Sequence, residues 1–218
     1  MKIKPLTALF AFMFITSFSC SSCKAQDPAR FQDEIDSLKN LTIPPGSTIF
    51  VGSSSIRLWP DLNSWFPKRT MYNLGFGGSE TSDLNHYLEV LLLSQRPDTV
   101  LIYEGDNDIN SGKSINQILE DTRHLVASLK RDLPDVVLYF ISPKPSPSRW
   151  HLKKEYETYN QQLKLFCKAN ELGFIDVWDP MLGPNGKPVS KLFQSDSLHM
   201  LHAGYQIWTE AVLDKLDD

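Results

Sequence analysis

Asp196 and His199 lie three positions apart in the sequence Asp-Ser-Leu-His. At this spacing the two side chains can lie on the same side of one turn, so the carboxylate can hydrogen-bond one ring nitrogen of the imidazole. Such a contact fixes the tautomer of the ring and leaves the other nitrogen available as a general base. The alternative is an aspartate cap and a surface histidine before the last helix.

A candidate nucleophile for this base lies in the three consecutive serines Ser53, Ser54 and Ser55. They follow Gly52 and the apolar run 49–51, which is typical of a buried strand. Open α/β sheets place their chemistry at the carboxyl ends of strands. By itself the run Gly-Ser-Ser-Ser is more typical of a plain turn with a serine helix cap.

Two further loops offer hydrogen-bond donors. The segment 73–79 ends in Gly77-Gly78-Ser79, where glycines let backbone N–H groups approach a ligand; it lacks the full spacing of a dinucleotide-binding loop. The segment 105–108 supplies the side-chain amide of Asn107. A hydroxyl, a base with its carboxylate, and several donors are the components of an acyl-transfer site.

The carboxylates of the same loops also suggest a metal site. The segment beginning at Asp106 starts like a calcium loop, but Ser111 replaces the required glycine and Gln117 the bidentate glutamate. We therefore predict no metal and no cofactor. The alternative is a metal-dependent phosphoesterase that uses Asp106, Asp108 and Asp196.

Strand-like and helix-like segments alternate along the chain, as in α/β proteins with a parallel sheet covered on both faces. The predicted strands are 48–51, 70–74, 99–103, 136–141 and 174–178, and the predicted helices are 28–41, 81–93, 114–132, 150–172 and 204–216. The apolar runs 100–102 and 136–138 are typical of strands buried on both faces.

Residues 1–25 are predicted to be an export signal, because Lys2 and Lys4 precede a mainly apolar run, 6–18, that is too short to span a bilayer. Cleavage before Gln26 would release a soluble protein, which we favour. The alternative is a lipoprotein junction with an acylated Cys20. We predict one catalytic domain over 26–218, in a periplasmic or extracellular location.

Loss of residues 1–25 removes three lysines and no acidic residue, so the net charge changes from −4 to −7. An acidic protein is a poor partner for nucleic acid or an anionic membrane surface. Cys167 is then the one cysteine of the domain, and its helical setting indicates packing. The sequence gives no indication of the oligomeric state.

In their order along the chain these blocks resemble those of the SGNH hydrolase superfamily, the GDSL-type esterases and lipases. The most specific matches are 105–108, Gly-Asp-Asn-Asp, and 196–199, Asp-Ser-Leu-His, and the likeness runs from residue 49 to the last helix. The resemblance implies a three-layer α/β/α sandwich around a five-stranded parallel sheet, with a flavodoxin-like fold.

By position, the resemblance implies that Ser54 is the nucleophile, His199 the base and Asp196 its orienting acid. It implies an oxyanion hole formed by the Ser54 and Gly78 N–H groups and the Asn107 side chain.

Two positions depart from the family pattern, since Ser53 stands where an aspartate precedes the nucleophile and Ser79 where an acid often follows the glycine. Neither change removes a role. Arg149 and Trp150 follow the fourth predicted strand, so we predict that they line the cleft and suit a sugar or polar acyl donor. The alternative is a helix start anchored by Trp150 in the core.

The expected function is a secreted serine esterase acting on short-chain, chiefly acetyl, esters of a small molecule or glycan. The alternative is a non-catalytic carbohydrate-binding surface protein on an esterase scaffold.

Overall fold

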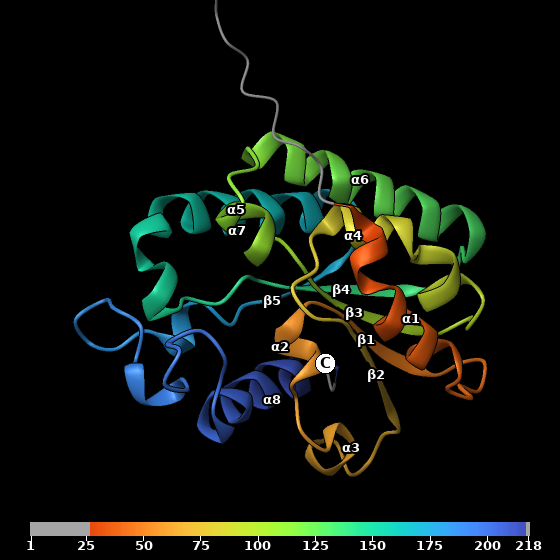
Figure 1. Ribbon diagram of the computed structural model, residues 1–218, viewed down its shortest axis with the longest axis horizontal. Coiled ribbons are helices and arrows are strands. Elements are labelled where there is room, and N and C mark those ends of the chain that lie inside the picture. Colours follow the sequence, from red (N-terminus) through yellow and green to blue (C-terminus); the bar gives the residue numbers. More distant parts are fainter. Residues whose placement is uncertain (1–26, 217–218) are drawn as a thin grey trace, which may run out of the picture.

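The computed structural model describes residues 27–216, so the predicted export signal and Cys20 lie outside the described part of the chain. Five parallel strands form one sheet in the order β2-β1-β3-β4-β5 (Figure 1). Their bounds are β1 Thr48–Gly52, β2 Met71–Gly75, β3 Thr99–Tyr103, β4 Val137–Ile141 and β5 Gly173–Ile175. In the central register Gly52 lies opposite Gly75 on one side and Tyr103 on the other, so these three strands end level with one another.

Helices cover both faces of the sheet, which confirms the predicted three-layer α/β/α sandwich (Figure 1). One face carries α1 Gln32–Lys39, α4 Thr81–His86, α6 Ile115–Asp132 and α7 Lys153–Ala169; the other carries α2 Ser54–Arg57, α3 Leu62–Trp65 and α8 His202–Leu216. Side chains alternate along each strand, so that Val51 packs on the face covered by α6 and α7 and Phe50 packs on the face covered by α8. The short α5 Asp106–Asn110 follows β3 directly.

Local sequence explains where α6 begins. At the start of α6 the Ser114 hydroxyl accepts from the Gln117 N–H at 3.3 Å, and the Gln117 side chain accepts from the Ser114 N–H at 3.0 Å, which forms a capping box. The predicted helix 81–93 is divided into α4 and a π-helical turn, Glu89–Leu93. The predicted helix 150–172 begins as a 3₁₀ turn, Pro147–Leu152, and continues as α7.

The last strand is shorter than the predicted 174–178. The Asp176 carboxylate accepts from the Trp178 N–H at 2.8 Å, and the Val177 N–H donates to the Ser142 hydroxyl at 2.9 Å. These side-chain partners replace the ladder hydrogen bonds of a strand, so β5 ends at Ile175.

Cys167 is fully buried in α7, where burial raises the pKa of its thiol to about 12, in keeping with a packing role. Among residues 27–216 no helix is both long and apolar enough to cross a membrane.

Candidate active site

The carboxyl end of β1 presents one accessible serine. Gly52 has a φ of +133°. A Cβ there would lie 2.0 Å from the Tyr103 carbonyl oxygen of the neighbouring strand β3, so only glycine fits at this position. The chain then enters α2, with Ser53 and Ser55 1% and 2% exposed and Ser54 half-buried. Of the three serines, Ser54 is therefore the one whose hydroxyl a substrate can reach.

His199 and Asp196 lie on the loop before α8 and extend from the Ser54 hydroxyl in one line. The His199 Nε2 atom is 3.1 Å from Ser54 Oγ, and Nδ1 is 2.6 Å from Asp196 Oδ2. Ser197 adopts a φ of +60°, and in this tight turn Asp196 Oδ1 also accepts from the backbone N–H groups of Leu198 and His199, at 2.9 and 3.0 Å. This arrangement puts the three side chains in the order that nucleophile, base and orienting acid require.

The Asp196 carboxylate stays ionised. Burial alone would raise the pKa of Asp196, but the hydrogen bonds from the Leu198 N–H and from His199 outweigh it and lower the pKa to about 2. An ionised Asp196 accepts the Nδ1–H of His199 and leaves Nε2 as the proton acceptor toward Ser54.

Three hydrogen-bond donors follow the carboxyl ends of the neighbouring strands β1, β2 and β3. Among the described residues, neither the Ser54 N–H nor the Gly78 N–H donates to a protein group. Gly78 has a φ of +75°, and nothing lies within 4 Å of a Cβ placed on it, so this residue borders open space. The third donor is the Asn107 amide, whose Nδ2 donates one hydrogen to the Ser79 carbonyl at 2.8 Å. The β2–α4 and β3–α5 loops are thereby joined.

A buried charged network lies next to Ser54. The Asp106 carboxylate accepts hydrogen bonds from the Lys144 ammonium at 2.9 Å and from the Arg149 guanidinium at 2.6 Å. It also accepts from the Tyr103 hydroxyl at 2.8 Å and from the Tyr156 hydroxyl. Burial would raise the pKa of Asp106, but Lys144 and Arg149 hold it well below its usual range. Lys144 also donates to the Ser55 hydroxyl at 3.0 Å, so the network reaches the residue next to Ser54.

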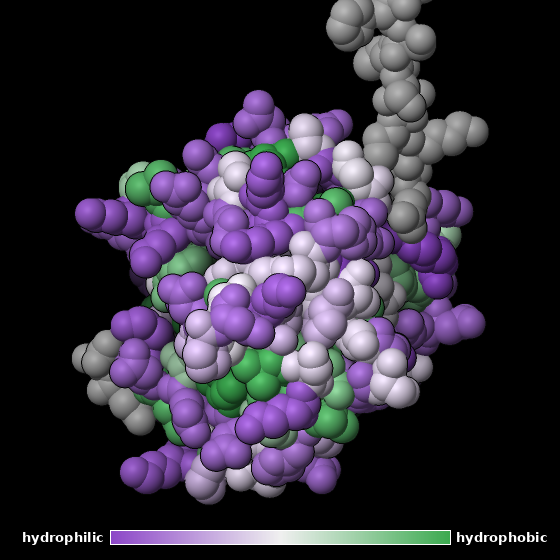
Figure 2. Space-filling model, turned by 90° about the vertical axis from the view of Figure 1, so that its left-hand side faces the viewer, coloured by the Kyte–Doolittle hydropathy of each residue, from purple (hydrophilic) through white to green (hydrophobic). Residues whose placement is uncertain are grey.

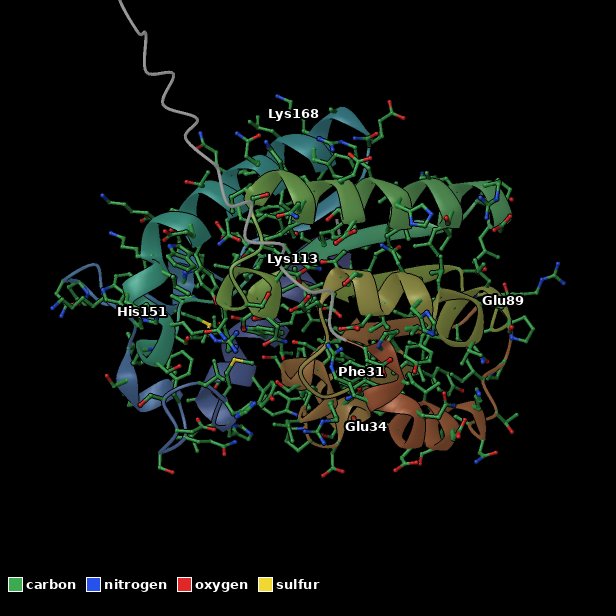
Figure 3. All side chains as sticks on the ribbon, turned by 45° about the horizontal axis from the view of Figure 1, so that its top comes forward. Phe31, Glu34, Glu89, Lys113, His151 and Lys168 are labelled. Atoms are coloured by element: carbon green, nitrogen blue, oxygen red, sulfur yellow. The ribbon has the colours of Figure 1, made fainter. Side chains whose placement is uncertain are left out.

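A second cluster fixes the start of α4. Asp108 accepts from the Thr81 N–H at 3.0 Å and pairs with Lys113 at 3.1 Å. Lys113 also pairs with Glu80 at 3.0 Å and with Asp121 of α6 at 3.2 Å (Figure 3). The loop that carries Asn107 is thus tied to the loop that carries Gly78.

These pairings bear on the metal hypothesis. Asp106, Asp108 and Asp196 do not converge: the first faces Lys144 and Arg149, and the other two pair with Lys113 and His199 respectively. Within residues 27–216 no group of three or more histidine, cysteine, aspartate or glutamate side chains is arranged to hold a metal ion.

The segment 144–149 contacts α2, α5 and the loop that carries His199. Besides the contacts of Lys144, the Ser148 N–H donates to the Ser197 carbonyl at 3.1 Å, on the loop of His199. Arg149 Nη2 donates to Asn107 Oδ1 at 2.9 Å. The contacts of Lys144 were not predicted from the sequence. Its position shortly after β4, at the sheet edge where the other site residues gather, could have indicated them.

The predicted cleft residues Arg149 and Trp150 are more enclosed than a rim position suggests. The Arg149 side chain is 11% exposed and points to Asp106 and Asn107. Trp150 stacks on Trp178 with ring centroids 5.9 Å apart, and the Lys153 ammonium lies 5.3 Å from the Trp150 ring centroid. Their role in binding substrate stays a prediction.

Figure 2 shows the side of the molecule on which the strands end, where an apolar area is framed by hydrophilic side chains. Leu58, at the end of α2, and Leu201, two residues after His199, are both exposed. Close to Leu201, His202 packs against Trp65 with ring centroids 4.4 Å apart. Exposed apolar side chains thus lie close in sequence to both Ser54 and His199.

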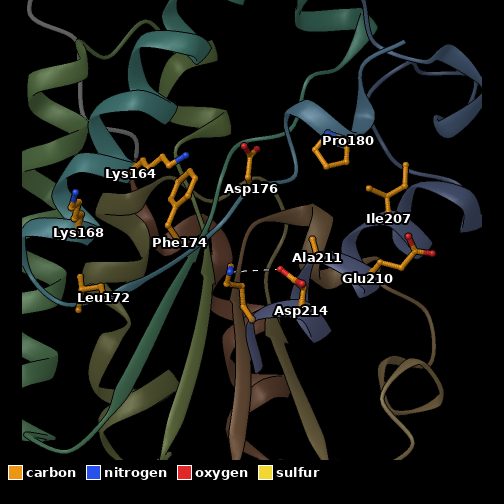
Figure 4. A pocket seen from close by; sticks show the side chains of 11 residues that line it. Lys164, Lys168, Leu172, Phe174, Asp176, Pro180, Ile207, Glu210, Ala211 and Asp214 are labelled. Carbon is orange, nitrogen blue, oxygen red and sulfur yellow. Dashed lines mark ion pairs between the residues drawn. The ribbon is translucent and has the colours of Figure 1, made fainter. Parts of the chain in front are cut away.

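A large hollow lies elsewhere, at the β5 edge of the sheet (Figure 4). It measures about 810 Å³ and is lined by residues of α7, β5 and α8, among them Phe174, Lys164 and Asp214. None of the residues near Ser54 lines this hollow, so the hollow is separate from the candidate active site.

The five-stranded parallel sheet, with serine, glycine, asparagine and Asp-x-x-His positions along one edge, is the architecture of the SGNH hydrolases. Residues 45–207 match the sequence model of the GDSL-like Lipase/Acylhydrolase family, and the chain belongs to that family. It is a carboxylic ester hydrolase.

Solved structures share the fold at low sequence identity. A protein from Streptococcus pneumonia proposed as a platelet activating factor superposes with a TM-score of 0.77 and 23% identity, over 87% of this chain and 92% of that one. A GDSL-like lipase from Bacteroides thetaiotaomicron gives 0.75 and 17%, over 88% and 98%. An acetylxylan esterase from Geobacillus stearothermophilus gives 0.61 and 18%, over 81% and 96%. No curated protein matches the chain by sequence.

Proposed function

We propose that this chain hydrolyses short-chain acyl esters, acetyl esters first among them, with Ser54 as nucleophile. The observation that carries the proposal is the unbroken line from Ser54 Oγ through the His199 ring, with contacts of 3.1 and 2.6 Å, to the Asp196 carboxylate. A relay of this geometry activates a hydroxyl that is otherwise a weak nucleophile at neutral pH.

In the proposed reaction Ser54 Oγ attacks the ester carbonyl while His199 Nε2 takes its proton. The negative oxygen of the tetrahedral intermediate is stabilised by the Ser54 and Gly78 N–H groups and by the free Nδ2 hydrogen of Asn107. His199 then gives the proton to the departing alcohol. A water molecule, deprotonated by the same nitrogen, releases the acid from Ser54.

The proposed substrate is an acetylated glycan or another small acetyl ester. A half-buried Ser54, whose hydroxyl a substrate can reach, suits a small acyl group carried by a larger alcohol, and the acetylxylan esterase named above has the same fold. We also propose that the chain is exported, on the strength of the sequence of residues 1–25, either as a soluble protein or anchored through an acylated Cys20.

The test compares the wild type with Ser54→Ala on p-nitrophenyl acetate, then on butyryl and long-chain esters and on acetylated xylan. Ser54→Ala is expected to abolish turnover while its circular dichroism spectrum and melting temperature stay those of the wild type. Turnover should fall as the acyl chain lengthens. Equal turnover by wild type and folded Ser54→Ala would show that Ser54 is not the nucleophile.

A further inference from the structure

The Asn107 amide can work in an oxyanion hole in only one of its two orientations. Its Nδ2 carries two hydrogens, whereas Oδ1 is an acceptor and would repel a developing negative charge. A rotation of 180° about the last side-chain bond exchanges the two ends with little change in shape. Something in the surroundings must therefore select the productive orientation.

Two neighbours of opposite character make that selection. Arg149 Nη2 donates to Asn107 Oδ1 at 2.9 Å, and a guanidinium can only donate. On the other side Asn107 Nδ2 donates to the Ser79 carbonyl at 2.8 Å, and a carbonyl can only accept. The reversed amide would set donor against donor and acceptor against acceptor, which leaves one orientation and one free Nδ2 hydrogen.

Arg149 is itself held rigidly. Its Nη1 donates to the Asp106 carboxylate at 2.6 Å and to the Asp106 carbonyl at 3.0 Å, and only 11% of the side chain is exposed. The two arms of the planar fork thus reach two successive residues, 106 and 107. A lysine, with a single ammonium, cannot reproduce this geometry.

We propose that Arg149 is a positioning residue that fixes the Asn107 amide for the oxyanion. This role rests on the proposed esterase function. It differs from direct contact with the substrate, because the guanidinium acts through Asn107. Loss of Arg149 should therefore lower the rate of the chemical step and leave substrate binding unchanged.

The test is a double-mutant cycle between positions 149 and 107, read as kcat and KM for p-nitrophenyl acetate. Loss of one oxyanion donor costs roughly 10²–10³ in kcat, so Arg149→Met should lower kcat by about 10- to 100-fold with KM nearly unchanged. In an Asn107→Ala background the same substitution should lower kcat by less than about threefold, since the group it positions is gone. Equal losses in both backgrounds, or a loss confined to KM, would overturn the proposal.

Two variants guard against a merely structural effect. Arg149→Lys keeps a positive charge for Asp106 without the fork, so it should melt near the wild-type temperature yet lose about tenfold in kcat. Arg123→Met removes an exposed guanidinium on α6 that pairs with Glu120, so its kcat should stay within about threefold of wild type. Wild-type kcat in Arg149→Lys would refute the positioning role even if Arg149→Met fails to fold.

The two proposals fail in different ways. No difference between wild type and Ser54→Ala would overturn the esterase function and the role of Arg149 with it. A normal Ser54-dependent rate, with additive losses at positions 149 and 107, would overturn the role of Arg149 alone.

Discussion

Replacing Lys113 by methionine should destabilise the protein severely, because one buried ammonium serves three carboxylates. Lys113 is 11% exposed, and Glu80, Asp108 and Asp121 lie 3.0, 3.1 and 3.2 Å from its Nζ, with 4%, 0% and 31% of their side chains exposed. Burial alone would lower the pKa of Lys113, but Asp108 and Glu80 raise it, so the ammonium stays charged. Methionine has a similar length and leaves these carboxylates without their cation.

Removing one partner of a buried ion pair costs about 3–5 kcal/mol, because the charge left behind has lost its compensation. For a domain of this size that corresponds to a fall in melting temperature of roughly 6–20 °C. Urea unfolding of Lys113→Met should show a lower midpoint with an unchanged slope. The matched control is Arg123→Met on α6, whose partner Glu120 lies 2.7 Å away with both side chains exposed; its effect should stay within about 0.5 kcal/mol.

The pH dependence of the Lys113→Met defect follows from Asp108. Burial raises the pKa of this carboxyl, and Lys113 opposes the rise. Without the lysine the folded state holds the proton of Asp108 to higher pH than the unfolded state does, so stability falls as pH increases. The defect should therefore be larger at pH 8 than at pH 5. A defect no larger than that of Arg123→Met, or one that grows on acidification, would refute the reasoning.

Two further predictions concern the edge of the oxyanion hole. Burial raises the pKa of Glu104 well above its usual value; one carboxyl oxygen accepts from the Ser79 hydroxyl at 2.6 Å and the other has no partner. As pH rises, the folded state therefore keeps a proton on Glu104 that the unfolded state has released, which costs stability. Glu104→Gln should for this reason raise the melting temperature more at pH 8 than at pH 4. A gain that does not depend on pH would contradict this. Gly78→Ala and Gly112→Ala, at φ of +75° and +88° with open space around both, should lose a similar stability of about 1 kcal/mol. Only Gly78→Ala should lower kcat/KM, by roughly tenfold or more, because its methyl group lies beside a donor N–H; equal activity in the two variants would place Gly78 outside the site.

The sheet could be predicted from sequence because a strand buried on both faces leaves a short apolar run. The segment 99–103 coincides with β3, β1 extends one residue beyond its prediction, and β2 is shifted by one residue at both ends. The prediction was wrong for the end of β5, where Val177 and Trp178 are apolar enough for a strand. The competing side chains of Asp176 and Ser142 decide that boundary, and no periodicity reveals their contacts.

The residues of the candidate site were found by their order along the chain, but their surroundings were not. The choice of Ser54 among three serines came from a family resemblance, and burial of its two neighbours gives it an independent reason. The ion pair of Lys144 with Asp106 joins residues 38 positions apart, and charged residues in loops carry no pattern that pairs them. The direction of the Arg149 side chain was equally hidden, because an arginine after a strand can turn outward to a ligand or inward to a carboxylate.

The segment 144–149 makes the site difficult to alter piece by piece. Its contacts reach α2 through Ser55, α5 through Asn107 and the loop before α8 through Ser197. An insertion or deletion there would move three loops together, whereas the exposed residues 184–187 of the β5–α8 connection make only local turn contacts. Directed evolution of acyl or alcohol preference should therefore begin from that connection and from the surface around Leu58 and Leu201, and keep the length of 144–149 constant.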